Sequence, residues 1–255
     1  MAILVVSPKQ GFGHFYDASG NPVDGGLRMA RKVNAFPSVT TISSCVRNFG
    51  IEVYKREQFG LALMTLERNI GETDSEFIER ANEDSEAHSK DAMAKGTHIH
   101  GLWENLEKIN LAELDPIDKE RCEILETWKS ENILKIEKSE HVVVDKRRGF
   151  AGRFDTLCRI KDGTKKGQLT LLDLKTMSPK NGKMKPYDSH VLQLSAYRLA
   201  LGEDVECGNL LFNSGDKPDI HFHKWEKAEV ENAVPAFLGL LAYWQWSNNY
   251  YPNLN

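Results

Sequence analysis

Residues 141–201 carry the pattern that most restricts how this chain can fold. Three runs in this segment have the length and apolar content of β-strands, at residues 141–146, 150–160 and 168–176. Gly149 and the sequence Lys161-Asp-Gly-Thr164 mark the turns between them, and a helical run over 188–201 ends before Gly202. Short turns join antiparallel neighbours, so we predict three antiparallel strands followed by a helix.

The third predicted strand contains the sequence Leu172-Asp173-Leu174-Lys175. Because side chains alternate along a strand, Asp173 and Lys175 are expected on one face and the two leucines on the other. Asp155, in the preceding strand, can lie close by. Two neighbouring carboxylates repel unless a cation lies between them, and Mg²⁺ prefers oxygen ligands. A surface Asp–Lys pair on an edge strand is the simpler interpretation of this triplet taken alone.

The rest of the chain is predicted to be mainly helical before this unit and mixed after it. Residues 1–35 are rich in turn-forming glycines and are expected to form loops. Residues 36–42 lead into a helix with Ser38 or Thr40 as its N-cap. Helices are expected at 50–109, with a break near 69–74 and a new start at 95–97, and at 116–134 and 226–248. Two further strands are expected at 209–213 and 220–225. We therefore predict one α/β domain over residues 1–255.

Charge is the main argument against a nucleic-acid partner, because the chain has a net charge of −4. Local patches decide such binding, however. Basic residues gather around the candidate acids, at Lys146, Arg147, Arg148 and Arg153, and at Lys175, Lys180, Lys183 and Lys185. Acidic residues concentrate elsewhere, in 72–86 and 104–126. For Lys180–Lys185 alone, an ordinary solvated surface is an equally good interpretation.

The four cysteines and the apolar runs exclude several other classes. Cys45, Cys122, Cys158 and Cys207 are scattered, which argues against a zinc ribbon, an iron–sulfur cluster and a disulfide framework. No apolar run approaches the roughly 20 residues that span a bilayer, and the N-terminus does not resemble a signal peptide. We expect a cytoplasmic protein with reduced thiols and no membrane partner.

Five short motifs occur in an order that resembles a known family. Gly152-x-x-Asp155, Asp173-x-Lys175 and Gln193-x-x-x-Tyr197 together resemble the PD-(D/E)XK nuclease superfamily. The segment 96–104, with His100 four residues after its glycine, resembles the histidine-bearing helix of the RecB-like branch. Residues 36–42, preceded by 14–22, are similar to the corresponding segments of bacteriophage-type exonucleases and of the mitochondrial genome maintenance exonuclease. Phe154 stands where the superfamily has proline, as is common in this branch.

The resemblance implies a fold and a metal site. The fold would be a restriction-endonuclease-like core, with a mixed central sheet flanked by helices and a helical N-terminal half. Residues 1–135 would form an arch for the DNA end, and 136–255 the catalytic core. His100, Asp155, Asp173 and the backbone carbonyl of Leu174 would ligate one or two Mg²⁺ or Mn²⁺ ions. Lys175 would be the catalytic lysine, and no nucleotide cofactor is implied. Imidazole suits Mn²⁺ better than Mg²⁺.

Further residues are candidates for holding DNA or supporting the metal site. Gln193 and Tyr197, one helical turn apart, would hold the DNA strand or brace the catalytic loop, although Tyr197 could simply be a core residue. The other candidates at DNA are Ser38, Thr40, Thr41, Lys180, Lys183 and Arg153, with helix capping as the alternative for the first three. Glu104 and Glu140 could support the metal ligands, or could be a helix acid and a strand end exposed to solvent.

These residues predict a metal-dependent DNA exonuclease that hydrolyses phosphodiester bonds from DNA ends. The resemblance implies a role in phage recombination, replication or repair, in bacterial or phage-infected host cytoplasm. A single-strand annealing protein would then be a partner. Two alternatives remain open: a catalytically inactive DNA-binding accessory protein with the same fold, and a zinc hydrolase using the pairs His98–His100 and His221–His223.

Overall fold

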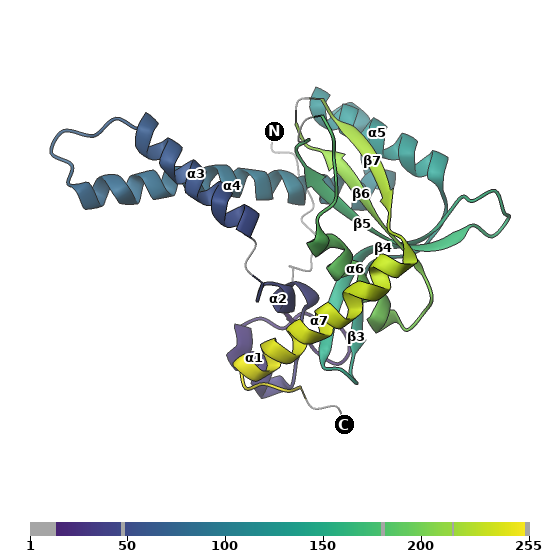
Figure 1. The fold of residues 1–255 in the computed structure, drawn as a ribbon. Helices are drawn as coiled ribbons and strands as arrows, with labels where there is room; N and C mark the ends of the chain where they lie inside the picture. Colours follow the sequence, from purple (N-terminus) through teal and green to yellow (C-terminus); the bar gives the residue numbers. More distant parts are fainter. Residues whose placement is uncertain (1–13, 47–48, 180–181, 216, 253–255) are drawn as a thin grey trace. The chain divides into compact units, whose positions relative to one another are not determined.

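The computed structural model describes residues 14–46, 49–179, 182–215 and 217–252 (Figure 1). It divides into two compact units, one formed by Met1–Cys45 with Ile99–Asn255 and the other by Val46–His98. Among the described residues, no helix has both the length and the apolar character needed to cross a membrane. That residues 1–255 act as a single nuclease domain stays a prediction.

The elements follow one another in the order helices, strands, helix, strands, helix. The helices are α1 (Gly26–Val33), α2 (Val39–Ser43), α3 (Phe49–Thr65), α4 (Asp74–Asn105), α5 (Pro116–Asn132), α6 (Asp188–Leu201) and α7 (Lys227–Ser247). The strands are β1 (Phe15–Tyr16), β2 (Phe36–Pro37), β3 (Ile133–Asp145), β4 (Phe150–Ile160), β5 (Gln168–Met177), β6 (Glu206–Asn213) and β7 (Asp219–Lys224). Two short 3₁₀ turns, Leu106–Lys108 and Leu111–Glu113, connect α4 to α5.

The main sheet has five strands in the order β3-β4-β5-β6-β7. β5 and β6 pair in parallel through the crossover helix α6, and the other neighbours are antiparallel. The sheet is therefore mixed, as predicted. The predicted bounds of β4 and α6 are confirmed, and Gly202 ends α6 in the left-handed conformation with φ 68°.

Helices cover both faces of this sheet (Figure 1). Leu157 and Leu171 face a core shared with α6 and α7, in which Phe237 is fully buried. Their sequence neighbours Cys158 and Leu172 face a second core with α5 and the last turns of α4. The alternation of the strands thus builds two apolar layers, which confirms the predicted sheet flanked by helices.

β3 is longer than predicted, because it begins at Ile133, directly after α5, rather than at residue 141. Its first half is polar and irregular, with register shifts between Ile133 and Lys135 and between Ile136 and Lys138. Glu137 forms ion pairs there with Lys135 and with Arg159 of β4. A solvated edge strand of this kind lacks the apolar alternation by which strands are recognised.

The N-terminal segment contains more structure than the predicted loops. Residues 1–13 lie outside the described range. α1 was not predicted, because glycines precede it and only Ala30 in it is fully buried. The predicted cap at Ser38 is confirmed, since its Oγ accepts the Thr41 N–H at 3.1 Å. β1 and β2 form a small antiparallel pair next to it.

The unit Val46–His98 is helical, and the predicted break near 69–74 is confirmed between α3 and α4. The predicted helix start at 95–97 is wrong, because α4 runs without interruption through Gly96. Glu72 in the connection accepts two hydrogen bonds from the Arg80 guanidinium, both at 2.9 Å. This arrangement holds the pKa of Glu72 at about 2, with the Arg80 hydrogen bond as the largest cause.

Candidate active site

The candidate site forms where β4 and β5 separate. β4 pairs with β3 along its whole length, but its pairing with β5 ends at Thr156 and Leu172. Asp155, the residue before Thr156, directs its carboxylate to the backbone of β5, where Oδ2 accepts the Leu174 N–H at 2.8 Å. A side chain thus replaces the ladder hydrogen bond, and it holds the first predicted acid beside the strand that carries the second.

Asp173 and Lys175 form a close pair on one face of β5. The Lys175 Nζ lies 3.0 Å from Asp173 Oδ1 and 2.9 Å from Oδ2. Leu172 and Leu174 point into the opposite core, so the predicted division of faces is confirmed. Asp173 is 0% exposed. Burial, with the charge of Asp155 adding to it, raises the pKa of Asp173 to about 6, although Lys175 and His100 oppose this.

Lys175 is held in its charged form. Burial disfavours its ammonium group, but the charges of Asp173 and Asp155 outweigh burial and raise its pKa. The side chain is 24% exposed, so its end can reach a ligand at the surface. A fixed cation beside two acids can offset negative charge that develops on a phosphate.

Asn209 of β6 orients Asp173 from the other side, and the sequence did not identify it. Its amide Nδ2 donates to Asp173 Oδ2 at 2.8 Å and to the Asp173 carbonyl at 3.2 Å. The Trp225 indole in turn donates to Asn209 Oδ1 at 2.7 Å. Asn209 is fully buried, so each of these polar groups depends on the others. The only signal was an amide in an apolar strand, and Asn209 is one of two asparagines in β6.

The last turns of α4 bring His100 and Glu104 to the same place. His100 Nδ1 lies 3.6 Å from Asp155 Oδ2. Burial raises the pKa of Glu104, and the Asp155 charge acts in the same direction, whereas Arg153 and His100 lower it. The predicted shared face of His100 and Glu104 therefore faces the acids of the sheet.

Glu140 and Arg153 complete this cluster. Glu140 lies in β3 with a left-handed φ of 48°, and its Oε2 is 3.0 Å from Arg153 Nε. Burial and the charges of Asp155 and Glu104 raise the pKa of Glu140 to about 8, and Arg153 only partly opposes them. The Arg153 side chain is 5% exposed. It therefore balances charge within the site, while its predicted contact with DNA stays a prediction.

The chemistry of this donor set fits a divalent cation. Asp155, Asp173, Glu104 and Glu140 are carboxylates close enough to influence one another. Burial raises the pKa of Glu104, Glu140 and Asp173, and the charges of neighbouring carboxylates act in the same direction. A carboxylate has about four lone-pair sites, so Asp173 keeps acceptor capacity beyond Lys175 and Asn209. Within the described part of the chain, however, no three His, Cys, Asp or Glu side chains already converge on one point.

α6 places Gln193 and Tyr197 behind the site, one turn apart. Gln193 Nε2 donates to the Tyr197 hydroxyl at 2.8 Å. Tyr197 is 2% exposed and packs on Phe154. A Cβ atom at Gly152 would lie 2.5 Å from the Tyr197 ring and 2.9 Å from Val39. The glycine of the Gly152-x-x-Asp155 motif is therefore required by close packing, and Tyr197 braces the strand that carries Asp155.

The remaining predicted DNA contacts stay predictions. Ser38 is buried and its hydroxyl bonds to Thr40 and Thr41, which matches helix capping. Lys183 is exposed, and Lys180 lies outside the described residues.

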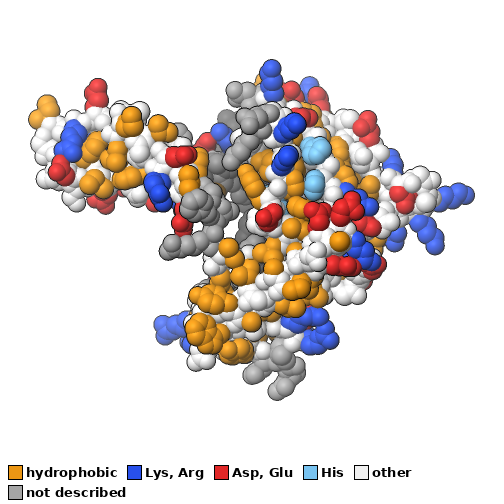
Figure 2. All heavy atoms as spheres, viewed as in Figure 1, with side chains coloured by type: hydrophobic (Ala, Val, Ile, Leu, Met, Phe, Trp, Pro, Cys, Tyr) orange, Lys and Arg blue, Asp and Glu red, His pale blue; other side chains and the backbone are white. Residues whose placement is uncertain are grey.

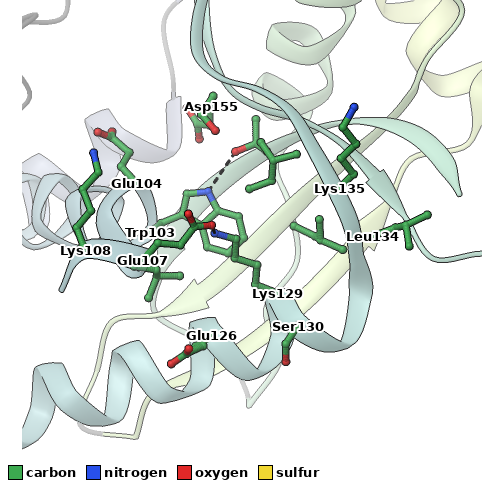
Figure 3. Close-up of a pocket in the computed structure, with 15 residues that line it drawn as sticks. Trp103, Glu104, Glu107, Lys108, Glu126, Lys129, Ser130, Leu134, Lys135 and Asp155 are labelled. Carbon is green, nitrogen blue, oxygen red and sulfur yellow. Dashed lines mark hydrogen bonds and ion pairs between the residues drawn. The ribbon is translucent and has the colours of Figure 1, made fainter. Parts of the chain in front are cut away.

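A cleft of about 710 Å³ opens beside Asp155 and Glu104 (Figure 3). α5, β3 and the turn after α4 form its walls, with Trp103 at its centre, where the indole donates to Thr156 Oγ1 at 3.2 Å. Three lysines line the cleft, Lys108, Lys129 and Lys135. The wall of the cleft therefore contains these lysines, the further acids Glu107 and Glu126, and apolar surface.

Comparisons with known proteins classify the chain. A family profile described as the PD-(D/E)XK nuclease superfamily matches residues 66–236. A crystal structure described as a "Putative exonuclease" from Eubacterium rectale has 14% identity and a TM-score of 0.43, over 62% of this chain and 67% of that one. The structure of SSO0001 has 14% identity and a TM-score of 0.31, over 74% and 85%. No curated protein matches. The TM-scores are too low to bear on function.

Proposed function

Because the chain belongs to the PD-(D/E)XK nuclease superfamily, we propose that it is a metal-dependent DNA exonuclease. The single observation that carries this proposal is the arrangement of Asp155, Asp173 and Lys175 where β4 and β5 separate. A binding protein has no need for a fully buried carboxylate paired with a lysine beside a second acid. Sites that hydrolyse phosphodiesters use such groups to hold a cation and to offset charge.

Nucleases of this superfamily generally use divalent metal ions. In this chain the proposed ligands are His100, Asp155, Asp173 and the carbonyl of Leu174, for one or two ions of Mg²⁺ or Mn²⁺. When bound, the metal supplies charge neutralisation and lowers the pKa of water. Asp155 stays oriented by the Leu174 N–H at 2.8 Å, and Asp173 by Asn209 at 2.8 Å. Lys175 offsets the negative charge on the phosphate.

Exonuclease action on DNA ends is the finer part of the proposal. It is supported by the resemblance of residues 36–42, preceded by 14–22, to segments of bacteriophage-type exonucleases and of the mitochondrial genome maintenance exonuclease. It is also supported by the cleft of about 710 Å³ beside Asp155, which is large enough for a small number of nucleotides. A role in phage recombination, replication or repair, a cytoplasmic setting and a single-strand annealing partner follow from the same resemblance.

The test compares linear DNA with a covalently closed circle of the same sequence, each with Mg²⁺ or Mn²⁺ and with a chelator. We expect nucleotides to be released from the linear DNA only, and only with metal. Placing the label at the 5′ or the 3′ end then gives the polarity of digestion. Comparing single- with double-stranded DNA gives the strand preference. Equal cleavage of the circle would contradict the exonuclease assignment. DNA binding without hydrolysis in any metal would indicate the inactive accessory protein instead.

A further inference from the structure

Exposed hydrophobic side chains gather at the ends of α1 and α7 (Figure 2). In the unit of Met1–Cys45 and Ile99–Asn255, eight large hydrophobic side chains are exposed among the described residues. Five of them lie on α1, on α7 or just after α7: Met29, Val33, Tyr243, Trp246 and Tyr251. We call these five residues the α1–α7 platform. Three are aromatic, with Trp246 68%, Tyr251 57% and Tyr243 53% exposed.

The platform is held in place by buried neighbours. Trp244 is 5% exposed and packs on Phe15 and Tyr250. The Tyr250 hydroxyl donates to the carbonyls of Ala30 at 3.0 Å and Ala35 at 2.7 Å, and so ties the chain after α7 to α1. The outward rings follow these anchors, and those of Tyr243 and Trp246 lie 6.0 Å apart between centroids. The backbone that carries the exposed aromatic rings is therefore anchored by buried contacts.

The charged side chains of α1 are all basic. α1 contains three exposed basic residues, Arg28, Arg31 and Lys32, and no acidic residue. Residues 232–255 contain no charged residue at all. The Arg31 guanidinium donates to the Asn248 carbonyl, which holds one cation two residues from Trp246. Figure 2 shows Lys or Arg side chains at the margins of this hydrophobic area. In a chain of net charge −4, this is a local cationic surface.

We propose that the α1–α7 platform is a second nucleic-acid site, which binds single-stranded DNA outside the catalytic centre. Exposed aromatic rings stack on unpaired bases, and adjacent cations contact the phosphates. None of the five platform residues lines the cleft beside Asp155. A strand bound there stays attached to the protein while its end is processed. The choice of DNA as the ligand rests on the proposed function, whereas the surface itself does not.

Single-stranded DNA fits this surface better than a lipid bilayer does. Rings of tyrosine and tryptophan, which occur both at membrane interfaces and where bases stack, make up most of the platform. Val33 is its only branched aliphatic residue. Membrane-binding faces present a broad apolar stripe along one helix. Here the rings come from the end of α7 and the chain after it, and the cations from α1.

The test measures binding of a labelled oligothymidylate of about 15 nucleotides by fluorescence anisotropy. It uses an Asp173→Asn background with chelator, so that no strand is cut. Replacing both Tyr243 and Trp246 with alanine should weaken binding at least about tenfold, since each lost stack contributes several-fold. Trp246→Phe should stay within about twofold. Ile117→Ala, at an exposed apolar position on α5, is the matched control and should bind like the parent.

Two results would overturn the proposal. One is an unchanged dissociation constant for the double variant when its thermal unfolding midpoint matches the parent. The other is a double variant that loses binding to phosphatidylserine vesicles but keeps DNA binding, which would make the surface a membrane site. Because binding is measured without cleavage, failure of the proposed nuclease activity does not affect the result. In the cleavage-competent chain, the double variant should raise KM and leave kcat unchanged.

Discussion

The carboxylate of Asp155 accepts the backbone N–H of Leu174 at 2.8 Å, at the point where β4 stops pairing with β5. One side chain therefore has two functions. It satisfies a backbone donor that the sheet leaves open, and the same oxygen, Oδ2, lies 3.6 Å from His100 Nδ1. Substitutions that keep one function and remove the other therefore distinguish an effect on stability from an effect on hydrolysis.

Asp155→Asn and Asp155→Ala are expected to differ in stability but not in activity. Asparagine keeps a carbonyl oxygen that can accept the Leu174 N–H, so its free energy of unfolding should stay within about 1 kcal/mol of the parent. Alanine leaves that donor without its partner, which should cost about 1–3 kcal/mol. Both remove the charge and should abolish hydrolysis. Urea unfolding and DNA cleavage measure the two effects, and an active Asp155→Asn enzyme would contradict the assigned role.

Gly152→Ala should disturb the site through Tyr197. The added Cβ would lie 2.5 Å from a buried aromatic ring, so the ring or the strand must move. We expect a loss of about 1–3 kcal/mol in unfolding free energy and a reduced cleavage rate. Gly239→Ala in α7 is the matched control, since a Cβ there meets nothing within 4 Å. That variant should be at least as stable as the parent. Equal stability of both variants would refute the packing explanation.

Asn209→Ala should reduce activity although Asn209 is not itself a proposed metal ligand. It removes the amide that orients Asp173 and leaves the Trp225 indole N–H without its acceptor. The unfolding free energy should fall by about 1–3 kcal/mol. Calorimetry should also show weaker binding of Mn²⁺. Asn213→Ala, at the end of the same strand, is the control and should keep metal affinity. Unchanged Mn²⁺ affinity in Asn209→Ala would show that Asp173 is held by other groups.

His190 should make the chain less stable as pH falls. Its Nδ1 accepts the Tyr187 N–H at 3.3 Å at the start of α6. Burial and the charge of Lys175 lower its pKa to about 4 from an unfolded value of 6.5. The unfolded chain therefore binds the proton first, and stability is lost as pH drops from 6.5 towards 4. After allowance for the partial exposure of the ring, the loss is about 2 kcal/mol.

The variant His190→Gln isolates this effect. Glutamine keeps a capping acceptor at the third helical position and does not titrate. Its unfolding free energy, measured by urea at pH 7 and pH 4.5, should fall less between the two pH values than that of the parent. An equal fall in unfolding free energy in both proteins would show that other groups account for the acid sensitivity.

The central strands and α6 were predictable because local signals agreed with tertiary structure. Turn residues and apolar alternation marked β4 and β5, and Gly202 marked the end of α6. The polar half of β3 and the basic helix α1 lack such signals, because solvent rather than a core surrounds most of their side chains. The role of Asn209 depends on a parallel pairing with β5, 36 residues away, which no local pattern contains.

The most direct test of the central claim is the rate at which nucleotides leave end-labelled linear DNA with Mn²⁺. We predict that Asp173→Asn and Lys175→Met each slow this rate at least about a hundredfold, while both proteins stay folded. Asp219→Asn and Lys224→Met, on the edge strand β7, are the matched controls and should keep the parent rate. Parent-like rates in Asp173→Asn or Lys175→Met would contradict the claim that this pair carries the reaction.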